Sequence, residues 1–231
     1  MFNDPKLIAL ITTLVTLFLT SIIKKLFDKN FLVFKLETEH RYEERKKVKD
    51  VLSKNKVHLL NACEKLNHRL FNLTKNHDKK WHYVAGNYKT RGYYFSSSIY
   101  RIAHVYARIE IIERELILLD TTIATKEDLD FVKYLRVFRE VLSDLFLMKG
   151  IDGYDDGGET DHLMRGSVDS MARALIKDDG TICDADEFVE SKNVYLPKLK
   201  SICSFFDSIS PEEKRYRWDR LQTLHLSLIH I

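Results

Sequence analysis

Proline is almost absent from this sequence. Its three prolines stand at positions 5, 197 and 211, so none interrupts the chain from Lys6 to Leu196. Glycine is also sparse outside residues 150–166. Because proline breaks a helix interior, this composition leaves long segments in which helices can run on. Apolar residues recur at the 3.6-residue spacing of helices along the same segments, and we therefore expect an all-α fold.

Standard motifs for metal binding and catalysis are missing as well. The three cysteines are widely spaced and form no C-x-x-C pair, so neither a zinc site nor a disulfide framework is predicted. The acidic loop at 151–161 does not fit a calcium-binding loop, because Tyr154 stands where a ligand is needed. His77, Asp78 and His82 fit no standard metal spacing. We expect no metal, no cofactor and no recognisable catalytic residue set.

A strong excess of charge of one sign is absent too. The net charge is only +3, and much of the basic excess stands next to an apolar N-terminal run. Nucleic-acid-binding domains carry a basic stripe on the folded body, whereas lysines beside a membrane favour anionic headgroups. We expect a lipid bilayer as a partner and no nucleic acid.

The longest uncharged stretch runs from Leu7 to Ile23 and contains seventeen residues. As a helix it would be about 25 Å long, slightly short of a hydrocarbon core of roughly 30 Å. Lys6 and Lys24 can extend their amino groups to the two interfaces, so we expect a single membrane span. A cleaved signal peptide, which would need a basic start and a small-residue cleavage site, and a buried core helix are the alternatives.

The basic residues around this span predict its orientation. Only Lys6 precedes it, whereas Lys24, Lys25, Lys29 and Lys35 follow, with further basic residues up to position 49. Positively charged flanks stay on the cytoplasmic side. We therefore expect a single-pass protein of the inner (plasma) membrane with its C-terminal body in the cytoplasm, where cysteines are reduced.

One face of the span carries small residues, namely Ala9, Thr12, Thr16 and Thr20. Small residues at this spacing let two helices approach closely in lipid, so the face is a candidate for self-association into a homo-oligomer. The alternative is that each threonine hydroxyl bonds to its own backbone.

The charge pattern divides the chain into segments. We expect a membrane anchor over residues 1–29 with its span at 7–23, a charged juxtamembrane helix or stalk over 30–56, and a helical bundle over 57–225. The stalk could pair with a second chain or pack on the body. Within the bundle, Thr125 is the expected cap of one helix, and the sequence Ser210-Pro211-Glu212-Glu213 is the expected start of the last.

The predicted helix from Tyr93 to Leu119 is apolar around most of its circumference, as expected of a central helix. Charged residues nevertheless recur along it, and buried charges need partners. The candidate ligand-binding residues on one side are Tyr100, Arg101, His104, Arg108 and Glu115. They would form a pocket for an anionic ligand; the alternative is a structural network of ion pairs and tyrosines between helices.

The last six residues, 226–231, read Leu-Ser-Leu-Ile-His-Ile. They match the translation of a sequencing-library transposon end, CTG TCT CTT ATA CAC ATC. The match predicts a metagenomic fragment whose reading frame ran into adapter, so that 226–231 would be a non-native tail and the native C-terminus would be missing. A genuine apolar helix end is the alternative.

Three blocks carry a resemblance to known sequences. The first block contains Tyr94, Ser98, Tyr100, Tyr106, Ile109-Glu110 and Arg114-Glu115; the second contains Met164-Arg165-Gly166, Met171, Ile176 and Asp179-Gly180; the third runs from Leu59-Leu60-Asn61-Ala62 to Leu70-Phe71-Asn72. Together they resemble an uncharacterised bacterial family of N-terminally membrane-anchored, all-helical proteins with no assigned activity. The chain departs from the family pattern at Ser167-Val168. The resemblance implies the layout of span and helical body and no mechanism.

Three functions are compatible with these features. The first is a non-enzymatic, membrane-anchored scaffolding or sensing module that binds an unknown partner protein or itself. The second is an anionic-ligand sensor or an unknown enzyme that uses the polar face of the helix at 96–119. The third is a defence or stress effector that acts on the membrane by oligomerising its span.

Overall fold

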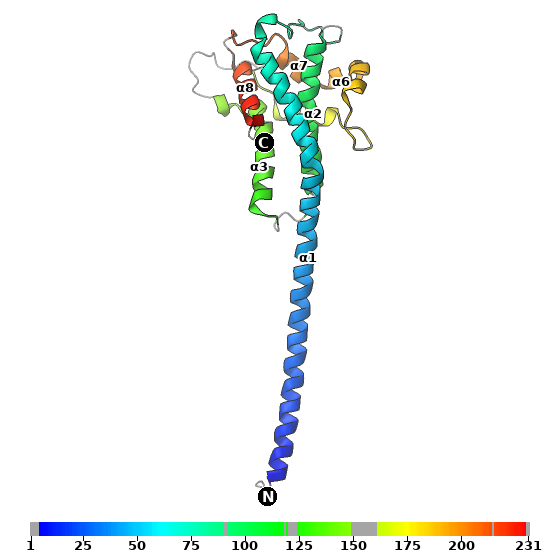
Figure 1. Ribbon diagram of the computed structural model, residues 1–231, viewed down its shortest axis with the longest axis vertical. Coiled ribbons are helices and arrows are strands. Elements are labelled where there is room, and N and C mark those ends of the chain that lie inside the picture. The colour runs from blue at the N-terminus through cyan, green and yellow to red at the C-terminus, as the bar shows by residue number, and fades with distance from the viewer. Residues whose placement is uncertain are drawn as a thin grey trace. The chain divides into compact units, whose positions relative to one another are not determined.

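The computed structural model describes residues 5–89, 92–117, 119, 124–148, 161–213 and 215–229. Within these ranges the regular structure is helical, and one isolated antiparallel bridge joins Ile176 to Ile182. The all-α prediction is therefore confirmed (Figure 1). Most of the acidic loop predicted at 151–161 lies outside the described residues. The α-helices are α1 (Pro5–Lys75), α2 (Tyr93–Ile117), α3 (Lys126–Ser143), α4 (Arg165–Ala174), α5 (Ala185–Glu190), α6 (Lys192–Lys198), α7 (Lys200–Phe206) and α8 (Tyr216–Ile229).

The chain divides into two compact units. Unit 1 is Met1–Lys47 and unit 2 is Val48–Ile231. Helix α1 contributes its N-terminal part to unit 1 and its C-terminal part to unit 2. The two units are described separately below.

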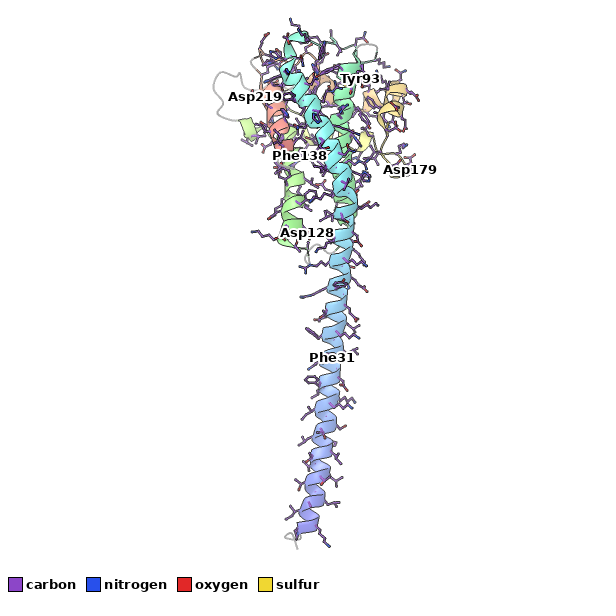
Figure 2. The ribbon with its side chains drawn as sticks, in the orientation of Figure 1. Phe31, Tyr93, Asp128, Phe138, Asp179 and Asp219 are labelled. Carbon is purple, nitrogen blue, oxygen red and sulfur yellow. The ribbon has the colours of Figure 1, made fainter. Side chains whose placement is uncertain are left out.

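Unit 1 is a helix whose apolar side chains are exposed. Phe18, Phe27 and Phe31 are among them, and Figure 2 shows the side chain of Phe31 standing out from α1. By length and composition, α1 contains a segment that could cross a membrane, and this segment buries nothing against the rest of the protein. A lipid environment would remove this apolar surface from water.

Unit 2 is built around α2, which is buried along most of its length. Helix α2 packs against α4, and α3 packs against α8. The part of α1 in unit 2 adds one apolar stripe to the core. Residues with essentially no exposed surface include Leu66, Phe95, Ile99, Ile102, Tyr106, Phe138, Leu142, Phe206, Leu221 and Leu224. The burial of these large side chains supplies most of the free energy that holds unit 2 together.

The compact unit begins before residue 57, the boundary expected from the sequence. Val48, Leu52 and Asn55 are buried. Their spacing continues the buried stripe at Leu59, so one face of this charged segment lies in the core while the other faces are solvated. Only three apolar residues mark that face between positions 48 and 56, which is why its composition alone predicts a solvated stalk.

Capping residues in the sequence predict the start of α3 correctly but not the start of α8. The Thr125 side chain accepts a hydrogen bond from Asp128 N, and the Asp128 carboxylate accepts one from Thr125 N, so the predicted cap of α3 is a full capping box. By contrast, the Ser210 hydroxyl accepts from Glu212 N in a turn, and α8 begins only at Tyr216.

The C-terminal residues belong to α8, which extends to Ile229. Leu228 is buried, and the carbonyl oxygen of Ser227 accepts a hydrogen bond from the Tyr134 hydroxyl of α3. Ser227 and Leu228, in the segment expected to be a non-native tail, therefore pack within unit 2, while 230 and 231 lie outside the described residues.

Candidate functional site

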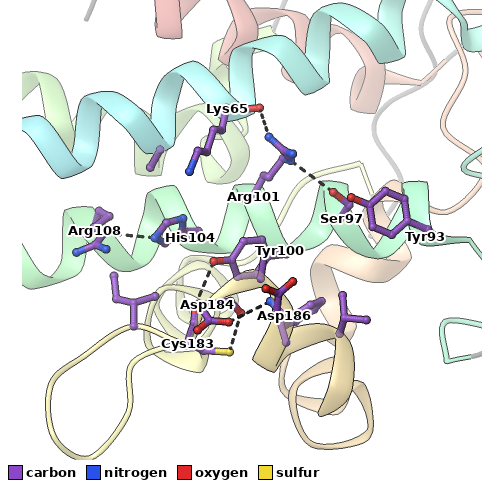
Figure 3. A pocket seen from close by; sticks show the side chains of 15 residues that line it. Lys65, Tyr93, Ser97, Tyr100, Arg101, His104, Arg108, Cys183, Asp184 and Asp186 are labelled. Atoms are coloured by element: carbon purple, nitrogen blue, oxygen red, sulfur yellow. Dashed lines mark hydrogen bonds between the residues drawn. The ribbon is translucent and has the colours of Figure 1, made fainter.

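Helix α2 places a set of polar side chains on one face because its residues 93, 97, 100, 101, 104 and 108 recur at helical spacing. This face borders a cavity of about 370 Å³ in unit 2. The C-terminal part of α1 adds Lys65, and the segment that leads into α5 adds Cys183, Asp184 and Asp186. Figure 3 shows these side chains around the cavity.

The wall formed by α1 and α2 carries positively charged side chains. An Nη of Arg101 donates to the Lys65 carbonyl oxygen at 2.9 Å, and its Nε donates to the Ser97 hydroxyl at 3.4 Å. Arg69 donates to the same hydroxyl at 2.9 Å, while its guanidinium also lies 4.2 Å from the Tyr94 ring centroid. Burial and the nearby charge of Arg69 both lower the pKa of Arg101.

Arg108 lies two turns further along α2. Its Nε donates to Nε2 of His104 at 3.3 Å, and burial lowers the pKa of Arg108. Among the described residues, no carboxylate oxygen lies within 4.0 Å of a side-chain nitrogen of Lys65, Arg69, Arg101 or Arg108. Half-buried guanidinium groups with only neutral acceptors are unusual, since charged groups removed from water are normally paired.

His104 is the neutral member of this wall. Burial, followed by the charges of Arg108 and Lys65, lowers the pKa of His104 to about 4. Its Nε2 accepts from Arg108, so the proton of the neutral ring is on Nδ1. The imidazole adds no charge to the cavity at neutral pH.

Tyr100 connects α2 with α5 across the floor of the cavity. Its hydroxyl donates to the Cys183 carbonyl oxygen at 3.2 Å, and its ring lies 5.4 Å from His104 and 5.3 Å from Phe188, centroid to centroid. Burial raises the pKa of Tyr100 to about 12. Tyr100 is therefore a neutral, fixed spacer between the two walls.

The opposite wall carries negative charge. One oxygen of the Asp184 carboxylate accepts from the backbone N–H groups of Asp186 and Glu187, at 3.0 and 2.9 Å, and so caps α5. Asp186 lines the cavity from the first turn of α5, and both aspartates are exposed. Sequence reasoning did not include these two aspartates or Lys65 in the site, because they come from distant parts of the chain.

Of the five ligand-binding residues predicted from the sequence, Tyr100, Arg101, His104 and Arg108 line the cavity. Glu115 does not. Its carboxylate accepts from Nδ2 of Asn55 at 3.0 Å and lies 3.7 Å from Nζ of Lys54, so it joins α2 to α1.

A second polar face of α2 forms the structural ion-pair network that the sequence offered as the alternative. Arg139 of α3 contacts the carboxylates of Glu110, Glu113 and Asp169 at 2.5, 2.7 and 2.7 Å. Arg114 pairs with Glu110 at 2.8 Å, one turn away. These charges neutralise one another and hold α2, α3 and α4 together.

The predicted self-association face lies in unit 1. The hydroxyls of Thr12, Thr16 and Thr20 donate to the carbonyl oxygens of Ile8, Thr12 and Thr16. Each hydroxyl is thus satisfied within its own helix, which is the arrangement that the alternative interpretation requires. Ala9 lies on the same face by its spacing.

Metal binding finds no support in the described part of the chain, where no group of three or more His, Cys, Asp or Glu side chains is close enough together to hold an ion. Comparisons with protein-family models, with curated proteins and with solved structures gave no match. The function must therefore be argued from the cavity and the apolar N-terminal segment of α1.

Proposed function

We propose that this chain is a single-pass membrane protein whose helical unit 2 lies in the cytoplasm and binds a small anionic molecule in the cavity between α1, α2 and α5. The observation that carries the proposal is the set of cations around the cavity, Lys65, Arg101 and Arg108, without carboxylate partners. Arginine is well suited to carboxylate and phosphate recognition because its planar fork can donate two hydrogen bonds at once.

The electrostatics of the wall favour a bound anion. Holding like charges close together in a half-buried site is unfavourable, and the free energy needed must come from the rest of the fold. An anion in the cavity would neutralise these charges and release that unfavourable energy. Sites built for binding are often locally destabilised in this way when no ligand is present.

Binding without chemistry is the function that fits the cavity best. Tyr100 donates to a backbone carbonyl and His104 accepts from Arg108. The thiol of Cys183, which also lines the cavity, donates to the Asp184 carbonyl oxygen at 3.3 Å, and burial raises its pKa. These side chains do not form a nucleophile–base pair, which covalent catalysis would use. We therefore favour a sensor over an enzyme. We also favour it over a scaffolding module, which would not need a cavity lined by cations without carboxylate partners.

A stability measurement tests the proposal without knowledge of the ligand. We expect Arg108→Gln to raise the melting temperature of unit 2 by a few degrees, because it removes an uncompensated charge worth about 1 kcal/mol. Trp81 and Trp218 both lie in unit 2 and report its unfolding by fluorescence. Arg114→Gln is the matched control, since Arg114 is paired with Glu110 and its loss should lower the melting temperature. A lower melting temperature for Arg108→Gln would contradict the proposal.

Binding is tested directly with the full chain purified in a non-ionic detergent. We expect inorganic phosphate and pyrophosphate, at constant ionic strength, to raise the melting temperature of the wild-type chain and to have little effect on an Arg101→Gln/Arg108→Gln variant. An equal shift in both proteins would show that the anions act elsewhere.

Membrane anchorage is tested by fractionation. We expect the full chain in the membrane pellet and a chain without residues 1–30 in the soluble fraction, because the deletion removes the apolar segment. The cytoplasmic placement predicts that a membrane-impermeant amine-reactive reagent added to intact cells labels no lysine of unit 2. Labelling of an exposed residue such as Lys54 from outside would invert the topology.

A further inference from the structure

We infer that the ligand of this cavity is bipolar: a small phosphate ester that also carries a protonated amine. The inference rests on the proposed function, because the anionic group is taken to bind the cationic wall. It adds a protonated amine on the ligand, which would bind the opposite wall, where Asp184 and Asp186 face the same cavity.

The two walls carry opposite charges that do not meet. Figure 3 shows Asp184 and Asp186 across Tyr100 from Lys65 and Arg101. No nitrogen–oxygen distance of 4.0 Å or less joins the two walls among the residues that the structure describes. Asp184 and Asp186 are exposed, so water solvates them, and they leave the cations of the other wall without a carboxylate partner.

Tyr100 is the element that separates them. Its hydroxyl is fixed to the Cys183 carbonyl oxygen, and its ring packs on Phe188, which is 1% exposed. Asp184 is fixed in turn by the two backbone N–H groups at the start of α5. Asp184 therefore cannot move onto the arginines without losing its hydrogen bonds at the start of α5, and its negative charge stays at that end of the cavity.

Charge balance selects the kind of ligand. Lys65, Arg101 and Arg108 give three positive charges, Asp184 and Asp186 give two negative charges, and His104 is neutral, so the lining has a net charge of +1. A phosphate monoester with one ammonium group has a net charge of about −1 near neutral pH. A simple anion would leave the two carboxylates without a cationic partner in the cavity, and a simple amine would leave the two arginines without an anionic partner.

The size of the cavity agrees with such a molecule. Its volume is about 370 Å³, whereas one water occupies about 30 Å³ of liquid. The space therefore admits a phosphate, an amine and a short connecting chain between them. A phosphate and an ammonium group occur together in a free aminoalkyl phosphate, which is a monoester, and in the headgroup of an ethanolamine phospholipid, which is a diester with one negative charge fewer. The experiment below separates these two sources.

The test compares two probes that differ by one amine, 3-aminopropyl phosphate and propyl phosphate. Their affinities for the full chain in detergent are measured by calorimetry. We expect the amine to tighten binding about tenfold, the size of one additional charge-assisted hydrogen bond. We expect Asp186→Asn to remove most of this preference and to leave the affinity for propyl phosphate unchanged or improved. Glu190→Gln, on the same helix but outside the cavity, is the matched control and should keep the preference.

The outcomes distinguish this inference from the proposed function. Equal affinities for the two probes, or tighter binding of propyl phosphate, would overturn the bipolar ligand while the anion site stands. A preference that survives in Asp186→Asn would also overturn it. Binding of neither phosphate by the wild-type chain would overturn both.

A competition arm identifies the source of the ligand once the preference is found. The full chain is placed in nanodiscs of phosphatidylcholine alone or of phosphatidylcholine with phosphatidylethanolamine. Weaker binding of 3-aminopropyl phosphate in the second set of discs supports a lipid headgroup as the natural occupant. Equal binding in both supports a free aminoalkyl phosphate.

Discussion

Replacing Arg139 by methionine removes the cation that joins three helices of unit 2. Its guanidinium contacts Glu110 and Glu113 of α2 and Asp169 of α4. The side chain of Arg139 is 19% exposed and that of Glu110 is 11% exposed. Methionine keeps much of the length and apolar volume of the arginine side chain, so the substitution tests charge more than packing.

The expected loss is about 2–3 kcal/mol. Breaking a buried ion pair by removing one partner costs about 3–5 kcal/mol, because the remaining charge is left uncompensated. This network is partly exposed, and Glu110 keeps its contact with Arg114 at 2.8 Å, so the lower value applies. For a unit of this size, each kcal/mol lowers the melting temperature by about 2–4 °C, which gives a decrease of roughly 5–10 °C.

The pH dependence gives a second readout with a defined sign. Burial acts to raise the pKa of Glu110, but hydrogen bonds from Arg139 and Arg114 outweigh it and hold the pKa below its usual value. In the wild-type chain this carboxylate therefore contributes stability above its ordinary pKa, which is lost as the pH falls through the lowered pKa. Burial already raises the pKa of Glu113, so its contribution is present at low pH and is lost as the pH rises through that raised pKa.

Without Arg139, burial acts on both carboxylates with less opposition, and both become easier to protonate. We therefore expect the difference between wild type and Arg139→Met to be largest near pH 7 and to shrink as the pH falls towards about 4. Thermal unfolding followed by the fluorescence of Trp81 and Trp218 measures it. Lys133→Met, which removes an exposed pair with Asp130, is the control and should change the free energy of unfolding by less than about 1 kcal/mol. A loss for Arg139→Met as small as the control, or one independent of pH, would refute the reasoning.

Three further predictions use the same fluorescence assay. Phe138→Ala, at a side chain with no exposed surface, should cost about 3–5 kcal/mol; a loss under about 1 kcal/mol would mean that the site is not packed. Burial holds the pKa of both His82 and His104 at about 4, so unit 2 should lose stability as the pH falls from about 6.5 towards 4, and a double His→Gln variant should show a flatter dependence; an unchanged slope would contradict this. Thr125→Ala removes the capping box of α3 and should cost about 1 kcal/mol, whereas Thr125→Ser should be nearly neutral.

Local physics made part of this structure predictable. The near absence of proline and the helical spacing of apolar residues predict the helices, and the side chains of Thr125 and Asp128 predict the start of α3. The same periodicity brought Arg101, His104 and Arg108 onto one side of α2, because residues three, four and seven apart share a helix face. Each of these predictions needs only a few neighbouring residues.

The rest of the site depends on contacts between distant residues. Glu115 shares its spacing with Arg108, yet Asn55 and Lys54 of α1 bind it. Lys65 and Asp186 reach the cavity from segments that no periodicity links to α2. The residues Ser210 and Pro211 predict a helix start by local rules, but α8 begins at Tyr216. The side chain of Arg217, the next residue, donates to the carbonyl oxygen of Phe205 at 2.9 Å. Tertiary packing overrode the local preference there.

Two faces of α2 carry charged side chains in different surroundings, so the two can be compared within one helix. On one face, Glu110 and Glu113 are paired with Arg139, and these ion pairs stabilise the packing of helices. On another face, Arg101 and Arg108 are half-buried but have only neutral acceptors and an adjoining cavity. Asp184 and Asp186 lie on the far side of that cavity, but Tyr100 stands between them and the arginines. Because one helix carries both arrangements, the pairing of charges on the first face is not a general consequence of burial, and the proposed ligand would complete the second arrangement.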